Sequence, residues 1–192
     1  TFNAGASNYT FATTGTQNLT FTGAGIVING GSVSINNNAD IGFIGSSTLE
    51  FLHNSTAGNA IINNNINGNL QFYNSGTAGN ASIGNFGDIN FFNSSTAGNA
   101  SIANYSNMNF RDDSSAGGSS IKNYGTINLT FASTTGSANI VNYGVMSFYD
   151  MNTAGNASIT NNGIISLSGI STGGNANITN NNTLKFSDHT TA

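Results

Sequence analysis

Apolar and polar side chains alternate in pairs of short segments along this chain. Within residues 77–95 the two segments are Ala81-Ser82-Ile83 and Ile89-Asn90-Phe91. Alternation with a period of two is typical of a β-strand that buries one face. Residues that favour turns separate the segments, and no window shows the 3.6-residue period of an amphipathic helix. The pattern therefore predicts an all-β chain built from pairs of short strands.

The strand pair recurs at a regular interval. The glycines that mark one of its turns are Gly58, Gly79, Gly98, Gly117, Gly136, Gly155 and Gly174, and their spacing is constant from Gly79 onward. The constant step is about 19 residues, close to the periods of known solenoid repeats, and the first step is slightly longer. Three columns of large apolar residues and one of alanine keep the same interval, beginning at Ile83, Ile89, Phe91 and Ala81. Such self-similarity is the sequence signature of a solenoid protein.

Each repeat is expected to form one coil of a single-stranded parallel β-helix, or β-solenoid, with equivalent strands ~4.8 Å apart. We predict one domain over residues 1–192, with about ten coils of that length. Residues 1–48 are assigned to irregular N-terminal coils and residues 49–192 to regular repeats. The N-terminal part of the chain contains six candidate strands, at Tyr9-Thr10-Phe11, Leu19-Thr20-Phe21, Ile26-Val27-Ile28, Val33-Ser34-Ile35, Ile41-Gly42-Phe43 and Leu49-Glu50-Phe51.

An asparagine column runs two positions after the first isoleucine column. Its members are Asn85, Asn104, Asn123, Asn142, Asn161 and Asn180. Each asparagine lies two residues after an inward isoleucine, so its side chain is also expected to point inward. There an amide can form hydrogen bonds to the coils above and below. We interpret the column as a structural ladder rather than a ligand site. The glycines that follow it, Gly87, Gly125, Gly144 and Gly163, are expected to adopt a left-handed turn conformation.

The composition excludes several classes of function. Asn alone supplies 36 residues, whereas Lys and Arg supply 3 and Asp and Glu supply 7. So few basic residues leave no electrostatic footprint for nucleic acid or for an anionic membrane surface. The absence of Cys excludes a disulfide scaffold, a thiol nucleophile and a Cys-ligated metal. No apolar run approaches the ~20 residues that span a bilayer, so we expect no membrane insertion.

The acidic residues do not form a convincing catalytic or metal site. Asp112, Asp150 and Asp188 share one column, but on alternate coils and at a turn where exposed Asp is common. Glycoside cleavage requires two convergent carboxyl groups. The calcium-binding nonapeptide pattern of β-roll toxins is absent, and His53 and His189 lie at opposite ends of the chain. We therefore expect no enzymatic activity, no cofactor and no metal.

Two other columns could bind a ligand from the outside of the solenoid. The aromatic column consists of Phe86, Tyr105, Tyr124 and Tyr143. The threonine column consists of Thr56, Thr77, Thr96, Thr134, Thr153, Thr172 and Thr191. A row of exposed rings could bind sugars, although a corner ladder that stiffens the stack is the favoured interpretation. A row of threonines suggests ice binding, but the paired rows of a flat ice-binding plane are missing.

The unit STAGNASIxNxGxINF resembles the β-strand repeats of very large secreted bacterial proteins, namely autotransporter passengers and filamentous-haemagglutinin-like adhesins. The resemblance covers residues 49–192 closely. It implies a right-handed parallel β-helix, an extracellular or cell-surface location, and a role in adhesion or surface structure. Members of these families are far longer than this chain.

The two ends of the chain suggest self-assembly. Ala4-Gly5-Ala6-Ser7 is a degenerate copy of the AGNAS segment, and Thr191-Ala192 stop within a repeat. A second copy could therefore continue the stack almost in register, and a contact that does not close gives a filament. We expect a structural extracellular protein that stacks head to tail, with an axial repeat of about 48 Å for ten coils. The alternative is an adhesin passenger fragment, or a module that binds surface glycans through the aromatic or threonine column.

Overall fold

The computed structural model describes residues 7–13, 16–29, 32–37 and 47–191. Within them the chain forms short parallel strands and no helix. The odd-numbered strands form one sheet of nine, here called sheet 1. They are β1 (Tyr9–Thr13), β3 (Val33–Asn37), β5 (Ile61–Asn64), β7 (Ser82–Asn85), β9 (Ser101–Asn104), β11 (Ser120–Asn123), β13 (Asn139–Asn142), β15 (Ser158–Asn161) and β17 (Asn177–Asn180).

The even-numbered strands form a second sheet of nine, sheet 2. They are β2 (Asn18–Phe21), β4 (Thr48–Phe51), β6 (Asn69–Phe72), β8 (Asp88–Phe91), β10 (Asn107–Phe110), β12 (Thr126–Leu129), β14 (Val145–Phe148), β16 (Ile164–Leu167) and β18 (Thr183–Phe186). Each coil contributes one strand to each sheet, and a line of isolated parallel bridges forms a third side. The chain is therefore a parallel β-solenoid, as predicted.

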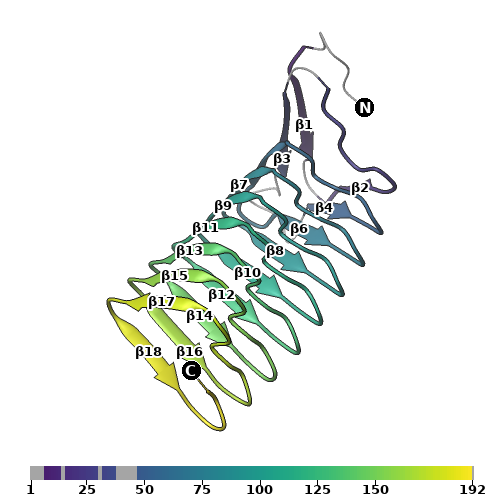
Figure 1. Ribbon diagram of the computed structural model, residues 1–192. Coiled ribbons are helices and arrows are strands. Elements are labelled where there is room, and N and C mark those ends of the chain that lie inside the picture. The colour runs from purple at the N-terminus through teal and green to yellow at the C-terminus, as the bar shows by residue number, and fades with distance from the viewer. Residues whose placement is uncertain (1–6, 14–15, 30–31, 38–46, 192) are drawn as a thin grey trace.

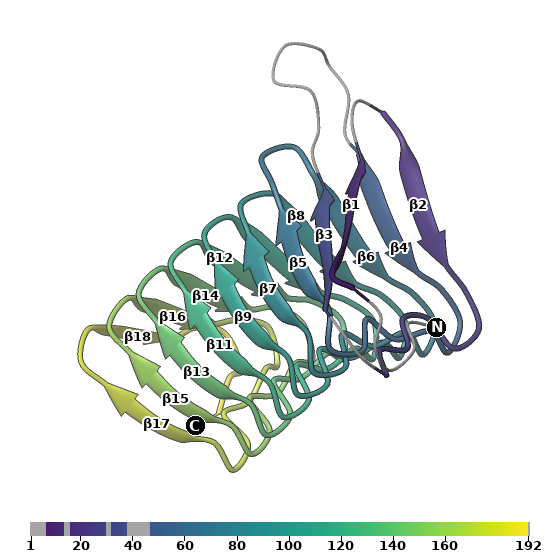
Figure 2. The ribbon, with the colours of Figure 1, turned by 90° about the horizontal axis from the view of Figure 1, so that it is seen from above.

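The register follows the sequence repeat. Ile83 pairs with Ile102, and Ile121 pairs with Ile102 and Ile140, so equivalent residues stack directly above one another. Figure 1 shows β1 and β2 at one end of the stack and β17 and β18 at the other. Figure 2 shows the strands of sheet 1 side by side, with sheet 2 behind them.

The number of coils is slightly lower than the predicted value of about ten, because each sheet holds nine strands in the described residues. Ile26-Val27-Ile28 was predicted as a strand and forms none. Instead, the Ile26 N–H donates to the carbonyl of Thr56 at 2.7 Å, as Ala57 does to Thr77 one coil later. Ile26 therefore belongs to the third side of a coil. The candidate strand Ile41-Gly42-Phe43 lies outside the described residues.

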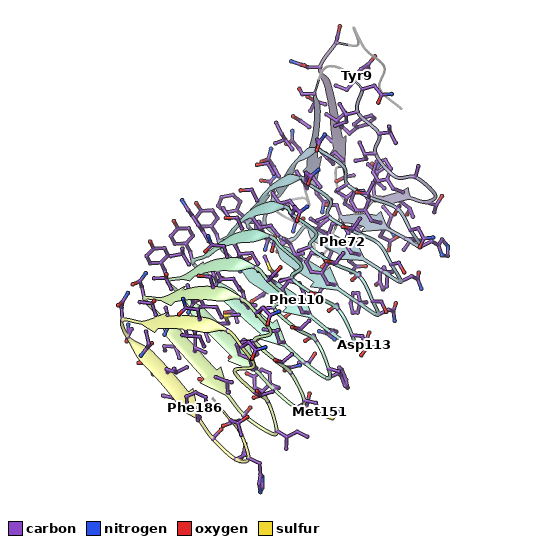
Figure 3. All side chains as sticks on the ribbon, in the orientation of Figure 1. Tyr9, Phe72, Phe110, Asp113, Met151 and Phe186 are labelled. Carbon is purple, nitrogen blue, oxygen red and sulfur yellow. The ribbon has the colours of Figure 1, made fainter. Side chains whose placement is uncertain are left out.

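The core is a set of apolar columns enclosed by the three sides. Phe21, Phe51, Phe72, Phe91 and Phe110 form a continuous stack, with ring centroids 5.1, 5.0, 4.8 and 4.8 Å apart. Figure 3 shows the labelled Phe72 and Phe110 side chains within the body of the stack. Full burial of such a side chain stabilises the fold by about 2–3 kcal/mol. Each coil buries only a few of these side chains, so the stack is stable as a whole rather than coil by coil.

The prediction of left-handed glycines after the asparagine column was wrong. Gly87, Gly125, Gly144 and Gly163 do not have positive φ. A Cβ on Gly144 would instead collide with the carbonyl oxygen of Gly125 in the preceding coil. At Gly144 the absence of a Cβ allows this close approach of two backbones. Seven left-handed glycines belong to the Thr-Ala-Gly turn, from Gly58 to Gly174, with φ of 58–62°, and the other described ones are Gly23, Gly25 and Gly169.

Gly144→Ala is expected to destabilise the solenoid by about 3 kcal/mol, because the added methyl group must push two backbones apart. The matched control is Gly84→Ala. Its Cβ would meet nothing closer than 3.7 Å, and Ala103 occupies the same position one coil later. Thermal unfolding should leave the control within about 0.5 kcal/mol of the native protein. Equal melting temperatures for the two variants would contradict the close-approach explanation.

Candidate functional sites

The asparagine column forms a buried ladder along the solenoid. In each coil the Nδ2 atom donates to the Oδ1 atom of the next asparagine, at 2.7–2.8 Å from Asn85 to Asn180. The ladder also contains Asn37 and Asn64, which are not among the predicted members. Both follow an inward isoleucine by two residues, so the same parity rule would have identified them. All these side chains are buried except Asn180, which belongs to the last described coil.

The ladder amides are saturated by the protein itself. The Nδ2 atom of Asn85 lies 3.0 Å from the carbonyl oxygen of Gly87, 2.7 Å from Asn104 Oδ1 and 3.0 Å from the carbonyl oxygen of Asn107. The same three contacts recur for Asn104, Asn123 and Asn142. A buried amide without its partners is costly, so this arrangement specifies the register of the coils. It leaves no donor for a ligand.

The predicted aromatic column lies on the outside of sheet 1, where it follows each strand. Phe86, Tyr105, Tyr124 and Tyr143 are each about half exposed, at 46–51%. Their ring centroids are 4.7, 5.0 and 5.2 Å apart, and neighbouring planes differ by 3–6°. Each inner ring is therefore covered on both faces by its neighbours. A sugar normally stacks on a ring face, so this column offers mainly ring edges and three phenolic hydroxyls.

A second aromatic contact does not follow from the sequence repeat. Tyr73 and Phe92 follow β6 and β8, and their rings stack at 4.7 Å. The Arg111 guanidinium carbon lies 5.6 Å from the centre of the Phe92 ring, close enough for a cation–π interaction. Both aromatic residues stand at the variable position after the phenylalanine column. The repeat does not predict the contact, because aromatic residues stand here in three of the coils, as Tyr73, Phe92 and Tyr149, and only Tyr73 and Phe92 are in neighbouring coils.

The stability of the protein is expected to change little between about pH 4 and about pH 9, since the ladder, the apolar columns and the backbone bonds do not titrate. At higher pH a decrease is expected. Burial raises the pKa of the Tyr73 hydroxyl above 10.0; Glu50 raises it further, whereas Arg111 lowers it. The neutral phenol is thus favoured in the folded state, and this stabilisation is lost as the pH rises through the folded pKa. Urea unfolding across the pH range would test this, and a steep loss near pH 4–5 would contradict it.

The threonine column lies on the third side of the solenoid. Isolated parallel bridges join Thr56, Thr77, Thr96, Ser115, Thr134, Thr153, Thr172 and Thr191. In seven of these coils the hydroxyl oxygen accepts the N–H of the glycine two residues later, at 2.8–3.0 Å. Ser115 occupies the threonine column in the coil between Thr96 and Thr134. The hydroxyls therefore stabilise the Thr-Ala-Gly turn of each coil, in a single row.

The acidic column lies in the turns that follow sheet 2. Asp112, Asp150 and Asp188 adopt a left-handed conformation, with φ of 57–62°. Each carboxylate accepts a backbone N–H from the preceding coil, at 2.8 Å from Asn93, 3.0 Å from Phe131 and 3.1 Å from Gly169. The side chains thus cap turns rather than converge. In the part of the chain that the structure describes, no group of three His, Asp or Glu side chains could hold a metal ion.

The two ends of the stack are only partly described. Of the predicted assembly residues, Ser7 and Thr191 lie in the described part, whereas Ala4, Gly5, Ala6 and Ala192 lie outside it. Thr191 continues the bridge column from Thr172. None of the described segments forms an apolar helix of membrane-spanning length.

The chain matches no family model, and comparison with curated proteins and with solved structures gives no significant match. The class of protein is therefore defined by the fold and the repeat. It is a tandem-repeat parallel β-solenoid in which one sequence repeat forms one coil.

Proposed function

We propose that this chain is a non-enzymatic structural protein of the extracellular space, which forms stiff fibres by stacking head to tail. The observation that carries the proposal is the similarity of the first and last described coils. At the last coil Leu184 and Phe186 remain partly exposed, and at the first coil Leu19 and Phe21 occupy the same two columns of sheet 2. A second copy would place Phe21 next to Phe186, as Phe51 lies next to Phe21.

The asparagine ladder supports the same direction of stacking. Asn180 accepts a hydrogen bond from Asn161 at 2.7 Å, and its own Nδ2 bonds only within the turn, to Asn182 at 2.9 Å. At the opposite end, Thr13 takes the ladder position and donates its hydroxyl hydrogen to Asn37 Oδ1 at 2.8 Å. The Thr13 oxygen keeps a lone pair that can accept a hydrogen bond, but Thr13 is 5% exposed, so a bond from Asn180 of another copy requires the residues that cover it to move aside. The Asn180 Nδ2 donor would then point toward the Thr13 oxygen of the next copy, in the same direction as every donor of the ladder.

The edge strands also favour continuation of the stack. β17 and β18 end their sheets at one side, and β1 and β2 end them at the other. Open strand edges are templates for pairing, and a head-to-tail contact that does not close produces a filament. Nine coils at ~4.8 Å give an axial repeat of about 43 Å, shorter than the value expected for ten coils.

The extracellular location and the kind of fibre are supported by the resemblance of the repeat unit to autotransporter passengers and filamentous-haemagglutinin-like adhesins. In such a setting the rod would be a surface fibre, a matrix filament or the stalk of an adhesin. The same stacking edge could equally join a passenger fragment to further coils of a longer chain. In each case the solenoid acts as a rigid spacer.

A second candidate is a module that binds surface glycans. It is supported by the row of exposed hydroxyls on Tyr105, Tyr124 and Tyr143, which is continuous over three coils. Because the ring faces are covered, the hydroxyls would have to supply most of the contact. A glycan array tests this candidate: saturable binding that is lost in Tyr124→Ala would favour it over a purely structural role.

Light scattering of the untagged chain over a concentration series tests the proposed function. Head-to-tail stacking predicts that the mean mass rises with concentration and that electron microscopy then shows unbranched fibres. A chain that stays monomeric at high concentration would contradict the fibre proposal and leave the fragment interpretation.

A further inference from the structure

The turns that follow sheet 2 carry an exposed apolar patch in three neighbouring coils, in the same turns as the exposed Tyr149. Its members are Phe131, Met151 and Ile170, with exposed fractions of 56%, 60% and 57%. They belong to three consecutive coils, after β12, β14 and β16. Figure 3 shows the labelled Met151 and Asp113 on this row of turns, outside the stack. Exposed apolar patches of this kind commonly mark an interaction surface.

Phe131 departs from the repeat in residue type, at a position whose backbone is left-handed in every described coil. The equivalent position in the other described coils is occupied by Gly23, His53, Asn74, Asn93, Asp112, Asp150, Gly169 and Asp188. All adopt positive φ, which small polar residues and glycine tolerate best. Phe131 is held in the same left-handed conformation, with φ of 61°, and its ring points to solvent. An aromatic residue there does not favour the turn, and strained residues of this sort concentrate at functional sites.

The patch contains a protrusion and a matching gap. Phe131 is the largest side chain of its column, and Gly169, two coils further on, has no side chain. Met151 lies on the coil between them. The backbone keeps these turns in register, because Met151 N–H donates to the Phe131 carbonyl at 3.0 Å and His189 N–H to the Gly169 carbonyl at 3.0 Å. Protrusion and gap are therefore equally far, about 4.8 Å along the axis, from the coil of Met151.

This symmetry defines the partner. We propose that the edge is an interface for a second copy of this chain, lying side by side and antiparallel. A two-fold axis through the coil of Met151 brings Met151 against its counterpart and sets each Phe131 ring over the bare backbone of the other copy's Gly169. Two-fold contacts of this kind are self-complementary.

The charged residues along the edge give one complementary contact and two contacts between like charges in this arrangement. Asp113 and His189 lie in the column of Met151, two coils before it and two coils after it. Antiparallel pairing therefore brings Asp113 of each copy next to His189 of the other. In the adjacent column the Asp150 residues of the two copies face each other. Asp112 of one copy, which follows Arg111, faces Asp188 of the other copy, so both contacts join like charges. The Asp150 carboxylate is bonded to the Phe131 N–H at 3.0 Å, which directs it toward its own chain.

The contact is small for a single pair of chains. Five coils span about 20–25 Å along the axis, which places the interface at the weak end of specific contacts. Pairing is therefore expected to be weak between single molecules and stronger between longer rods, where many copies engage together. The proposal does not depend on head-to-tail stacking, so it can be tested with that stacking blocked.

Cysteine cross-linking in a Phe186→Asp background provides the test, because the chain contains no natural cysteine. Met151→Cys should form a disulfide-linked dimer at least ten times faster than Ser158→Cys, an exposed control on sheet 1 in the next coil. A mixture of Asp113→Cys and His189→Cys chains should give the mixed dimer in preference to either homodimer. Equal rates for Met151→Cys and Ser158→Cys would overturn the interface, and preferred Asp113→Cys homodimers would overturn its antiparallel sense.

Two further variants separate loss of pairing from loss of folding. Phe131→Asn removes the protrusion, and asparagine is the natural residue at this position in Asn74 and Asn93. Gly169→Asn fills the gap, but its Cβ would lie 2.9 Å from the Asp150 carbonyl oxygen, so its melting temperature is measured beside its cross-linking rate. Each variant should reduce the Met151→Cys cross-linking rate to that of the control. Phe131→Asn should also raise the melting temperature, since its amide can cap the Asp112 N–H as Asn93 caps Asn74. Unchanged cross-linking in both variants would refute the proposed fit of Phe131 over Gly169.

Discussion

Replacing Asn123 by leucine should cost the solenoid about 4 kcal/mol, the largest effect expected of a single side chain that is not in the apolar core. Leucine is close to asparagine in size, so the variant removes hydrogen bonds with little change in volume. It leaves the Asn104 amide without the acceptor that it contacts at 2.8 Å, and it removes the donors to Asn142 Oδ1 and the Val145 carbonyl. These atoms lie in the interior, where water cannot replace the lost partner.

The control for this prediction is Asn109→Leu, on the outer face of sheet 2. Asn109 also belongs to a ladder, with bonds of 3.0 Å to Asn90 and Asn128, but it is only partly buried. Asn128 is partly exposed and Asn90 is 8% exposed on the outer face, where water can reach them more easily than the interior ladder, so a cost of about 1 kcal/mol is expected. Urea unfolding of the two variants compares them directly. Similar small losses would mean that the buried ladder does not hold the coils in register.

Phe186→Asp should stop fibre growth while leaving the single molecule folded. Phe186 is 43% exposed at the last described coil, so a carboxylate there remains hydrated in the monomer. In a fibre the same carboxylate would be buried against Phe21 of the next copy without a partner, which is strongly unfavourable. Light scattering should show a monomer at concentrations where the native chain forms fibres. Thermal unfolding should show a melting temperature within a few degrees of the native value.

The matched control is Ser187→Asp, which adds the same charge one residue later. Ser187 follows β18 and its hydroxyl bonds to the Leu167 carbonyl at the outer surface, so its side chain does not enter the stacked columns. This variant should form fibres like the native chain. If Phe186→Asp also forms fibres, the chain does not stack through the end coil described here.

Columns of identical residues explain why the fold could be predicted without a relative. A column such as Ile83, Ile102 and Ile121 predicts both where the strands lie and which strands pair, because a parallel stack pairs equivalent residues. The same argument placed the asparagines inside. It could not decide the conformation of Gly144, because glycine serves both left-handed turns and close backbone contacts. Only the distance to the preceding coil distinguishes the two.

Positions that break the repeat were the hardest to interpret from the sequence. Ile26-Val27-Ile28 has the alternation of a strand, yet it lies on the third side, where Ile26 takes the place of an alanine. The turn residue Phe131 carries no periodic signal, because its column holds mostly small polar residues. Its left-handed conformation and the gap at Gly169 are visible only in three dimensions. Such exceptions are where a repeat protein can acquire a specific contact.

Cryo-electron microscopy of fibres grown from the untagged chain is the most direct test of the central claim, that the solenoid continues from one molecule into the next. The account predicts one uninterrupted parallel β-helix with an axial repeat of about 43 Å, in which Phe186 lies next to Phe21 of the following copy. Isolated rods of a single chain's length, or fibres whose strands do not continue across the junction, would contradict it.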